Sequence, residues 1–307
     1  MIRTILVPLD GSDFAEHALP LAADLARKAN AALHLVRVHA LVTTEAWTGI
    51  PIPDVSDLHE RQDEQAYLAD VARRLTEKAP LTVETDLLDG DVVDALKAYA
   101  EEEKIDLVVM CTHARGTLGR FFLGSVADDL VTALRQPVLL VHPGEGKPDL
   151  AQQQPLSSIV VPLDGTPLAE NAVWPAADLA RLFDAELTLV RVNRPAILPS
   201  YLPDGYAIAA GQFQEADRIE SHDREESQKY LAQVASMVAV RGVKVRTDVV
   251  LDERVASGIL ADANARHAGL IAIETHGRRG LARLFFGSVA EQVVRRGEVP
   301  VLVHHGG

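Results

Sequence analysis

Residues 274–288 carry the residue types of an anion-binding loop: Glu274-Thr-His-Gly-Arg-Arg-Gly-Leu-Ala-Arg-Leu-Phe-Phe-Gly-Ser288. This stretch follows an apolar run and precedes a helical pattern, so we expect a strand, a loop and a helix N-terminus in that order. Glycines let backbone N–H groups come close to an anion, and the helix start adds unpaired N–H donors and the positive end of its macrodipole. Arg278, Arg279 and Arg283 add positive charge. The stretch therefore predicts a site for phosphate groups.

The same residues also fit a structure without a ligand. Ser288-Val-Ala-Glu291 is a capping box, in which the Ser and Glu side chains bond backbone N–H groups at the start of the helix. The arginines could equally be ordinary surface residues, and a short glycine motif alone is weak support for a site. Residues 274–288 by themselves leave both interpretations open.

An earlier copy of the stretch favours the interpretation as a site. Cys111-Thr-His-Ala-Arg-Gly-Thr-Leu-Gly-Arg-Phe-Phe-Leu-Gly-Ser125 matches it position for position, with Thr-His, Arg, Leu, Arg, Phe and Gly-Ser in register. Earlier in each half, Ile159–Thr166 repeats Ile5–Ser12, and Leu187–Val192 repeats Leu33–Val38. Repeats of this length indicate two copies of one domain and not a solenoid.

The two copies differ in length at one place. The strand repeats lie 154 residues apart, whereas Gly124 and Gly287 lie 163 residues apart. The second copy therefore carries nine extra residues between its second strand and its glycine-bearing loop. We expect them in the loop from Pro195 to Gly211.

The order of apolar runs predicts alternating strands and helices. In the first copy we expect strands at 2–9, 32–38, 82–88, 105–110 and 138–141, helices at 12–29, 57–78, 91–103 and 125–135, and a long loop at 40–57. Near-continuous apolar strands that alternate with helices predict an open parallel α/β sheet with helices on both faces. Residues 1–143 then form one domain (the first repeat), 144–156 a polar linker, and 157–305 a second domain (the second repeat).

Length and composition limit the class of protein. At 307 residues, with 48% apolar and 24% charged residues, the chain has the balance of a soluble globular protein with about two domains. It has no apolar run of about eighteen residues, and Met1 leads directly into a strand pattern without a signal peptide, so we expect a cytoplasmic protein with no membrane partner. A formal net charge of −14 argues against nucleic acid as a partner. The single cysteine, Cys111, excludes an internal disulfide, and no His or Cys spacing predicts a metal site.

Two aspartates extend the expected site beyond the loops. Asp10 and Asp164 each end the first strand of a repeat and precede a glycine. If the fourth strand returns beside the first, the strand order reverses between them, and open parallel sheets bind ligands outside the carboxyl ends of the strands at that point. Asp10 would then face the first loop, and Asp164 the second. Asp-Gly is also a common turn former, so a purely structural role stays an alternative.

Both repeats resemble universal stress protein domains over nearly the whole chain outside the linker. Nucleotide-binding members of that family carry Gly-x2-Gly-x9-Gly-Ser/Thr after the fourth strand and an Asp at the end of the first. The resemblance implies a Rossmann-like, adenine nucleotide alpha hydrolase-like fold with five parallel strands per domain. It also implies a stress-response protein that binds ATP or another adenine nucleotide, with or without Mg²⁺, as a sensor or regulator.

The resemblance also implies ligand-binding residues in both repeats. Adenine and ribose would lie near the Asp and near a Val at the end of the second strand, with the phosphates on the glycine loop and the following helix. The corresponding residues are Asp164, Val192, Gly277, Arg278, Gly287, Ser288 and Val289 in the second repeat and Asp10, Val38, Gly124, Ser125 and Val126 in the first.

Departures from the motif favour the second repeat as the nucleotide site. The first glycine of the motif is Cys111 in the first repeat and Glu274 in the second, and its second glycine is Ala114 and Gly277, respectively. If that second position needs a left-handed backbone, Ala costs about 1 kcal/mol there. Its methyl group would also block the close approach of a phosphate.

Two other functions stay open. The chain could be an interaction module in which the two domains pair with each other through their apolar last strands, Val138–Val141 and Val301–Val303. Such a module would act through protein partners or a homo-oligomer. It could also be an ATP hydrolase, although it has no Gly-x4-Gly-Lys-Ser/Thr loop, and His113 and His276 are the only candidates for acid–base work. We expect no fast enzyme and leave slow ATP hydrolysis open.

Overall fold

The computed structural model describes residues 2–39, 55–112, 124–152, 156–196, 210–275 and 287–305. It divides into two compact units. Unit 1 consists of Met1–Pro155, Thr275–Phe285 and Val294–Gly307, and unit 2 consists of Leu156–Glu274 and Phe286–Val293. Both glycine-bearing loops, residues 113–123 and 276–286, lie outside the described residues.

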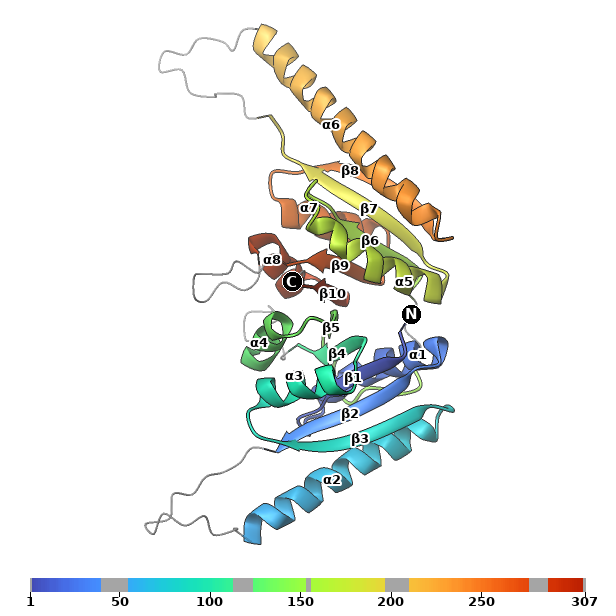
Figure 1. Ribbon diagram of the computed structural model, residues 1–307. Coiled ribbons are helices and arrows are strands. Elements are labelled where there is room, and N and C mark those ends of the chain that lie inside the picture. Colours follow the sequence, from blue (N-terminus) through green and yellow to red (C-terminus); the bar gives the residue numbers. More distant parts are fainter. Residues whose placement is uncertain are drawn as a thin grey trace, which may run out of the picture. The chain divides into compact units, whose positions relative to one another are not determined.

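Unit 1 contains an open sheet with helices packed against it (Figure 1). Its strands are β1 (Thr4–Pro8), β2 (Ala32–His39), β3 (Thr82–Asp89), β4 (Leu107–Cys111), β5 (Val138–Val141) and β10 (Val301–His304), in the spatial order β3-β2-β1-β4-β5-β10. Its helices are the 3₁₀ helix η1 (Ala15–Ala18), α1 (Leu19–Ala29), α2 (Val55–Thr76), α3 (Val92–Glu102) and α4 (Ser125–Ala133). Because crossovers between parallel strands are right-handed, α1 and α2 cover one face of the sheet, and α3 and α4 cover the other.

Unit 2 repeats this arrangement. Its strands are β6 (Ser158–Pro162), β7 (Glu186–Asn193), β8 (Lys244–Leu251) and β9 (Leu270–Glu274), in the spatial order β9-β6-β7-β8. Its helices are η2 (Ala169–Ala172), α5 (Val173–Phe183), α6 (Ala210–Ala239), α7 (Val255–Ala265) and the first residues of α8 (Ser288–Arg296). The same handedness rule puts α5 and α6 on one face, and α7 on the other.

The fourth strand returns beside the first in both repeats, which is the condition on which the expected site depends. β4 pairs with β1 in parallel, with Val108 opposite Leu6, and β9 pairs with β6 in parallel, with Ile271 opposite Val160. β2 and β7 lie on the other side of β1 and β6. Each repeat contributes five strands, so the predicted fold class, two copies of an open, largely parallel α/β domain, is confirmed.

The central strands are apolar because helices cover both faces of the sheet. Ile5, Leu6 and Val7 in β1 are 0% exposed, as are their counterparts in β6. The outer strands β3 and β8 are only partly covered and accordingly carry polar residues. The central strands therefore form a rigid base whose carboxyl ends hold the candidate site residues.

The last strands of the two repeats pair with each other within unit 1. β10 runs antiparallel to β5, with Val301 opposite Leu140 and Val303 opposite Val138. Both strands are buried apart from His304, which closes β10 and is half-buried. The prediction that these two apolar edges satisfy one another is confirmed.

The predicted position of the nine-residue insertion is wrong. The connection from β2 to α2 has 15 residues and that from β7 to α6 has 16, so the two loops have nearly equal length. Helix α6 has 30 residues, whereas α2 has 22, so the helix takes up eight of the nine extra residues. The sequence from Ala210 onward has few helix breakers and many good helix formers, so propensity favours extending the helix over lengthening the loop.

The first helix of each repeat begins later than periodicity predicts. The chain turns after β1 and forms η1 before α1 begins at Leu19. Pro20 lies in the first turn of α1, where its missing N–H costs no hydrogen bond. Helix α2, in contrast, begins at Val55, inside the stretch predicted as loop.

Candidate functional site

The carboxyl end of the first strand carries the same Asp-Gly turn in both repeats. In the first, Asp10 Oδ1 accepts hydrogen bonds from the backbone N–H of Ser12 at 2.9 Å and from its hydroxyl at 2.6 Å. In the second, Asp164 Oδ1 accepts from the N–H and hydroxyl of Thr166 at the same distances. Both aspartates are exposed. One carboxylate oxygen thus fixes the turn, while the described residues give Oδ2 no hydrogen-bond donor.

The glycines of these turns are required by backbone geometry. Gly11 has φ +86° and Gly165 has φ +90°, in the left-handed region that residues with a Cβ avoid. A Cβ at Gly165 would also lie 3.1 Å from a guanidinium nitrogen of Arg191, and a Cβ at Gly11 would clash with Arg37. An arginine from the second strand therefore packs directly against each turn.

Asp10 lies near the end of the fourth strand, as the topology predicts. Burial and, secondarily, the charge of Asp10 raise the pKa of the Cys111 thiol from 9.0 to about 12. Cys111 closes β4, so its electrostatic coupling to Asp10 shows that the two strand ends meet at one edge of the sheet. The thiol stays protonated at neutral pH, which agrees with a packing role and not with a reactive nucleophile.

The helices that follow the two loops begin at a glycine. The N–H of Asp128 donates to the carbonyl of Gly124 at 3.0 Å, and the N–H of Glu291 donates to the carbonyl of Gly287 at 3.0 Å. Gly287 is thus the N-cap, and Ser288 is the first residue of α8, so Ser288 is not the N-cap that a capping box requires. Gly124, the N-cap of α4, has no side chain with which to cap the helix. Such a helix start presents backbone N–H groups to an anion.

In the second repeat, the carboxyl end of β7 packs against α7. Val192 is half-buried, and a Cβ on Gly258 of α7 would lie 3.0 Å from its Cγ1. The counterpart of Gly258 in α3 of the first repeat is Ala95. Val38, at the same place in the first repeat, is also half-buried.

The predicted site residues divide into those that the structure describes and those that it does not. Asp164, Val192, Gly287, Ser288 and Val289 lie in unit 2, at the carboxyl ends of β6 and β7 and in the start of α8. Asp10, Val38, Gly124, Ser125 and Val126 occupy the same places in unit 1. Gly277, Arg278, Ala114 and the histidines His113 and His276 lie outside the described residues.

Glu274 occupies the place of the first motif glycine. It closes β9 and is 6% exposed, and the following Thr275 is 1% exposed. The carboxylate is therefore part of the buried strand end and is not a solvent-exposed side chain.

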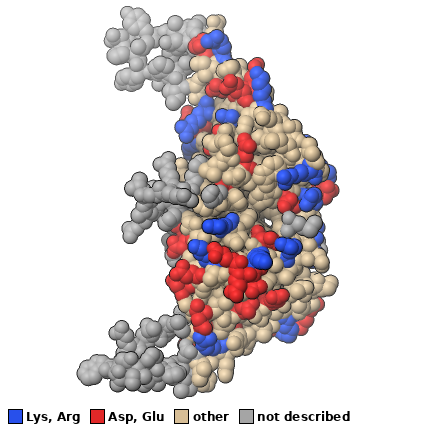
Figure 2. All heavy atoms as spheres, viewed as in Figure 1, with Lys and Arg blue, Asp and Glu red and all other residues tan. Residues whose placement is uncertain are grey.

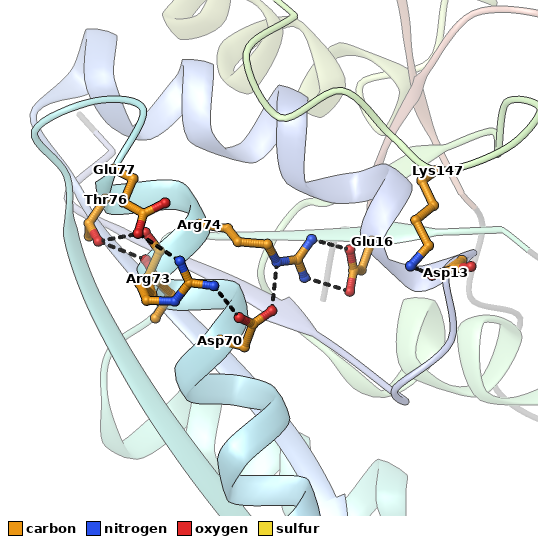
Figure 3. A network of polar contacts seen from close by, with 9 residues as sticks. Asp13, Glu16, Asp70, Arg73, Arg74, Thr76, Glu77 and Lys147 are labelled. Carbon is orange, nitrogen blue, oxygen red and sulfur yellow. Dashed lines mark hydrogen bonds and ion pairs between the residues drawn. The ribbon is translucent and has the colours of Figure 1, made fainter.

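Sequence reasoning missed a polar cluster beside each Asp-Gly turn. In the first repeat, Arg37 pairs with Glu64 at 2.9 Å, and Glu64 also binds His39 at 2.8 Å. Figure 3 shows a neighbouring network in which Arg74 of α2 donates two hydrogen bonds to the buried Glu16 of η1, at 2.8 and 3.0 Å. The available signal was an arginine inside an apolar strand at the same position of both repeats.

The surface charge and the composition of the described elements bear on possible partners. Figure 2 shows acidic side chains gathered over α3 and α4 of unit 1, where Asp94, Glu101 and Glu102 are exposed. This part of the surface would repel a nucleic-acid backbone. Within the described ranges, no helix combines the length and apolar character needed to cross a membrane. The same residues contain no cluster of three or more His, Cys, Asp or Glu suited to a metal ion.

The fold and the strand-end residues define a class: a tandem, doubly wound α/β protein with an acidic turn at each switch point. Comparison with known sequences gives the family. The universal stress protein family matches residues 1–142 and again residues 156–305, so the chain belongs to this family, a group of stress-response proteins.

Individual relatives agree with this assignment. A universal stress protein of Mycobacterium tuberculosis is 27% identical over 306 residues, covering 97% of this chain and 96% of the relative. A shorter one from Methanocaldococcus jannaschii is 32% identical over 145 residues, covering 46% of this chain and 82% of its own length. The crystal structure of a universal stress protein from Archaeoglobus fulgidus covers 99% of this chain and 96% of its own, with a TM-score of 0.67 at 19% identity, which supports the fold alone.

Proposed function

We propose that this protein binds ATP or a related adenine nucleotide, mainly in the second repeat, and acts as a sensor or regulator and not as a fast enzyme. The observation that carries the proposal is the state of Asp164. One of its carboxylate oxygens is held by Thr166, and the other receives no hydrogen bond from the described residues, on an exposed turn at the switch point of the sheet.

A nucleoside complements this turn. Carboxylate oxygens accept hydrogen bonds from ribose hydroxyls, as the acidic residue does in other doubly wound folds. β9, the strand beside β6, leads towards α8, whose first turn at Gly287 and Ser288 offers backbone N–H donors and a positive dipole end to phosphates. Ribose at Asp164 and phosphates at α8 would span the switch point.

The preference for the second repeat is supported by the loop sequence. Gly277 stands where the first repeat has Ala114, and only glycine combines a left-handed backbone with close phosphate approach. Arg278, in the second loop, would add charge-assisted bonds to phosphate oxygens. We therefore assign the first repeat a weaker site or none.

A regulatory role follows from the residues available. The sequence has no loop of the Gly-x4-Gly-Lys-Ser/Thr kind to hold a magnesium-bound triphosphate, and the Cys111 thiol is protonated. A bound nucleotide would act by favouring the conformation or association state to which it binds more tightly. We also propose that the protein is located in the cytoplasm.

The test is an equilibrium titration of nucleotide-stripped, full-length protein with ATP and MgCl₂, reading affinity and sites per chain. One site, weakened at least about tenfold by Gly277→Val in a folded protein, supports the proposal, since a steric block in a phosphate cradle costs at least about 1.4 kcal/mol. Asp164→Ala should weaken adenosine as well as ATP, because it removes a ribose contact. Unchanged affinity in both variants would contradict the placement of the site.

A second candidate function is an interaction module that binds no nucleotide. The pairing of β5 with β10 favours it, because the last strands of the two repeats are engaged with each other. No binding at millimolar ATP would support this module over the sensor. Turnover above a buffer blank that is lost in His276→Ala would instead support a slow hydrolase.

A further inference from the structure

The arginine beside the Asp-Gly turn differs between the two repeats in what holds it. In the first repeat, Glu64 accepts from Arg37 Nε at 3.0 Å and lies 2.9 Å from a terminal guanidinium nitrogen. Glu64 is itself 13% exposed and also binds His39. The charge of Arg37 is thus neutralised at contact distance by a half-buried acid.

In the second repeat the same position has no acid. Ser227 replaces Glu64 and donates its hydroxyl to Asn193 at 2.9 Å, and Asn193 replaces His39. Arg191 lies over the ring of Tyr230, 5.4 Å from its centroid, and forms no ion pair with any described residue. Among the described residues, no acid therefore neutralises its charge at contact distance.

Arg191 is close to the turn that carries Asp164. Three guanidinium atoms lie 3.1 to 3.3 Å from the Cβ position of Gly165, the residue after Asp164. Adjacent Cα atoms are about 3.8 Å apart, so the guanidinium lies within about 10 Å of the Cα of Asp164. At this distance a charge near a protein surface still changes the affinity for an anion.

The other charged groups of the cluster do not cancel the difference. Tyr230 donates its hydroxyl to Glu170 at 3.1 Å, and burial, followed by the charge of Glu170, raises the pKa of Tyr230. The charged residues are Asp10, Glu16, Arg37, Glu64 and Arg74 in the first repeat and Asp164, Glu170 and Arg191 in the second. Both clusters have a net charge of −1. They differ in position: Glu64 contacts Arg37 in the first repeat, whereas no acid stands at that position beside Arg191 in the second.

We infer that Arg191 is a specificity-determining residue of the second repeat, which favours anionic ligands over uncharged ones at the Asp164 turn, and that Glu64 removes this effect in the first repeat. This inference rests on the proposed nucleotide site. The inference extends the proposed function, because it assigns the preference for a phosphorylated over an unphosphorylated nucleoside to Arg191, a side chain outside the glycine loop.

The experiment compares ATP with adenosine as probes in the nucleotide-stripped, full-length protein. Arg191→Gln removes the charge, and Ser227→Glu places an acid beside Arg191 as Glu64 stands beside Arg37. Each variant should weaken ATP by about threefold to tenfold and leave adenosine within about twofold, and the loss should shrink as KCl is raised. The matched control Arg37→Gln should leave ATP affinity at the second repeat within about twofold.

Each other outcome overturns the inference in a recognisable way. An equal loss of ATP and adenosine in Arg191→Gln would mean that Arg191 only supports the turn. If Asp164→Ala and Gly277→Val weaken ATP while Arg191→Gln does not, this inference fails and the proposed function stands. If the wild-type protein binds no ATP, both fail. Ser227 is 2% exposed, so Arg191→Gln decides the result if Ser227→Glu does not fold.

Discussion

The ion pair between Arg74 of α2 and Glu16 of η1 allows a quantitative test of what holds η1 against α2 (Figure 3). We consider Arg74→Met, because Met237 stands at this place in the second repeat. The Glu16 side chain is 6% exposed and receives two hydrogen bonds from Arg74. The substitution therefore leaves a buried carboxylate without its cation.

The expected cost follows from the burial of the two partners. Removing one partner of a buried pair costs about 3–5 kcal/mol. Arg74 is 31% exposed, so water screens part of the interaction, and we expect about 3 kcal/mol, at the low end of that range. For a unit of this size, each kcal/mol lowers the melting temperature by about 2–4 °C, which predicts a decrease of about 6–12 °C.

The assay is differential scanning calorimetry, with hydrogen exchange to assign the transition to η1 and α2. The matched control is Arg73→Met, because Arg73 is 58% exposed and its partners Asp70 and Glu77 are exposed too, so we expect little change in stability. The double variant Glu16→Leu/Arg74→Met removes both charges and should recover most of the loss. The reasoning is refuted if Arg74→Met costs no more than Arg73→Met, or if the double variant is as unstable as the single one.

Three further predictions use other parts of the chain. Burial lowers the pKa of His142 below its ordinary 6.5, so the unfolded chain binds a proton more readily than the folded one. The free energy of unfolding should therefore fall as the pH drops below 6.5, and melting curves at several pH values would show this slope. If the same slope persists in His142→Asn, it does not come from His142. Gly258→Ala should lower the free energy of unfolding, measured in urea, by up to about 2 kcal/mol, because overpacking against Val192 outweighs the gain in helix propensity. A variant more stable than the wild type would show that α7 can move away from Val192 at little cost. Cys111 should react with iodoacetamide at pH 8 at least about tenfold more slowly in the folded protein than in urea, since its thiol stays protonated.

Much of the fold could be predicted because its signals are local and repeated. The apolar runs Ile5–Val7 and Val138–Val141 are strands in the structure, and the return of β4 beside β1, the condition for the expected site, is observed. The nine-residue insertion was misplaced because the spacings of 154 and 163 residues show only that the extra residues lie between the second strand and the glycine-bearing loop. Within that interval, the helix propensity of residues from Ala210 onward was the better guide.

The site was predictable only in part. Asp10 and Asp164 could be placed at the sheet edge from topology, because parallel strands bring their carboxyl ends together. Among the described residues Arg191 has no acidic partner, and this could not be predicted because it depends on Ser227, 36 residues further along the chain, which stands where the first repeat has Glu64. The placement of Gly277 and Arg278 remains a prediction.

The pairing of β5 with β10 also constrains how the chain is made. Leu140 and its partner Val301 are separated by 160 intervening residues, so β5 cannot gain its neighbour until almost the whole polypeptide has left the ribosome. During that interval the first repeat presents an apolar strand edge with unpaired N–H and C=O groups, which is the kind of surface that pairs with other chains. Nascent or C-terminally truncated chains should accordingly aggregate or require chaperones, whereas completion of the last strand closes this edge from within.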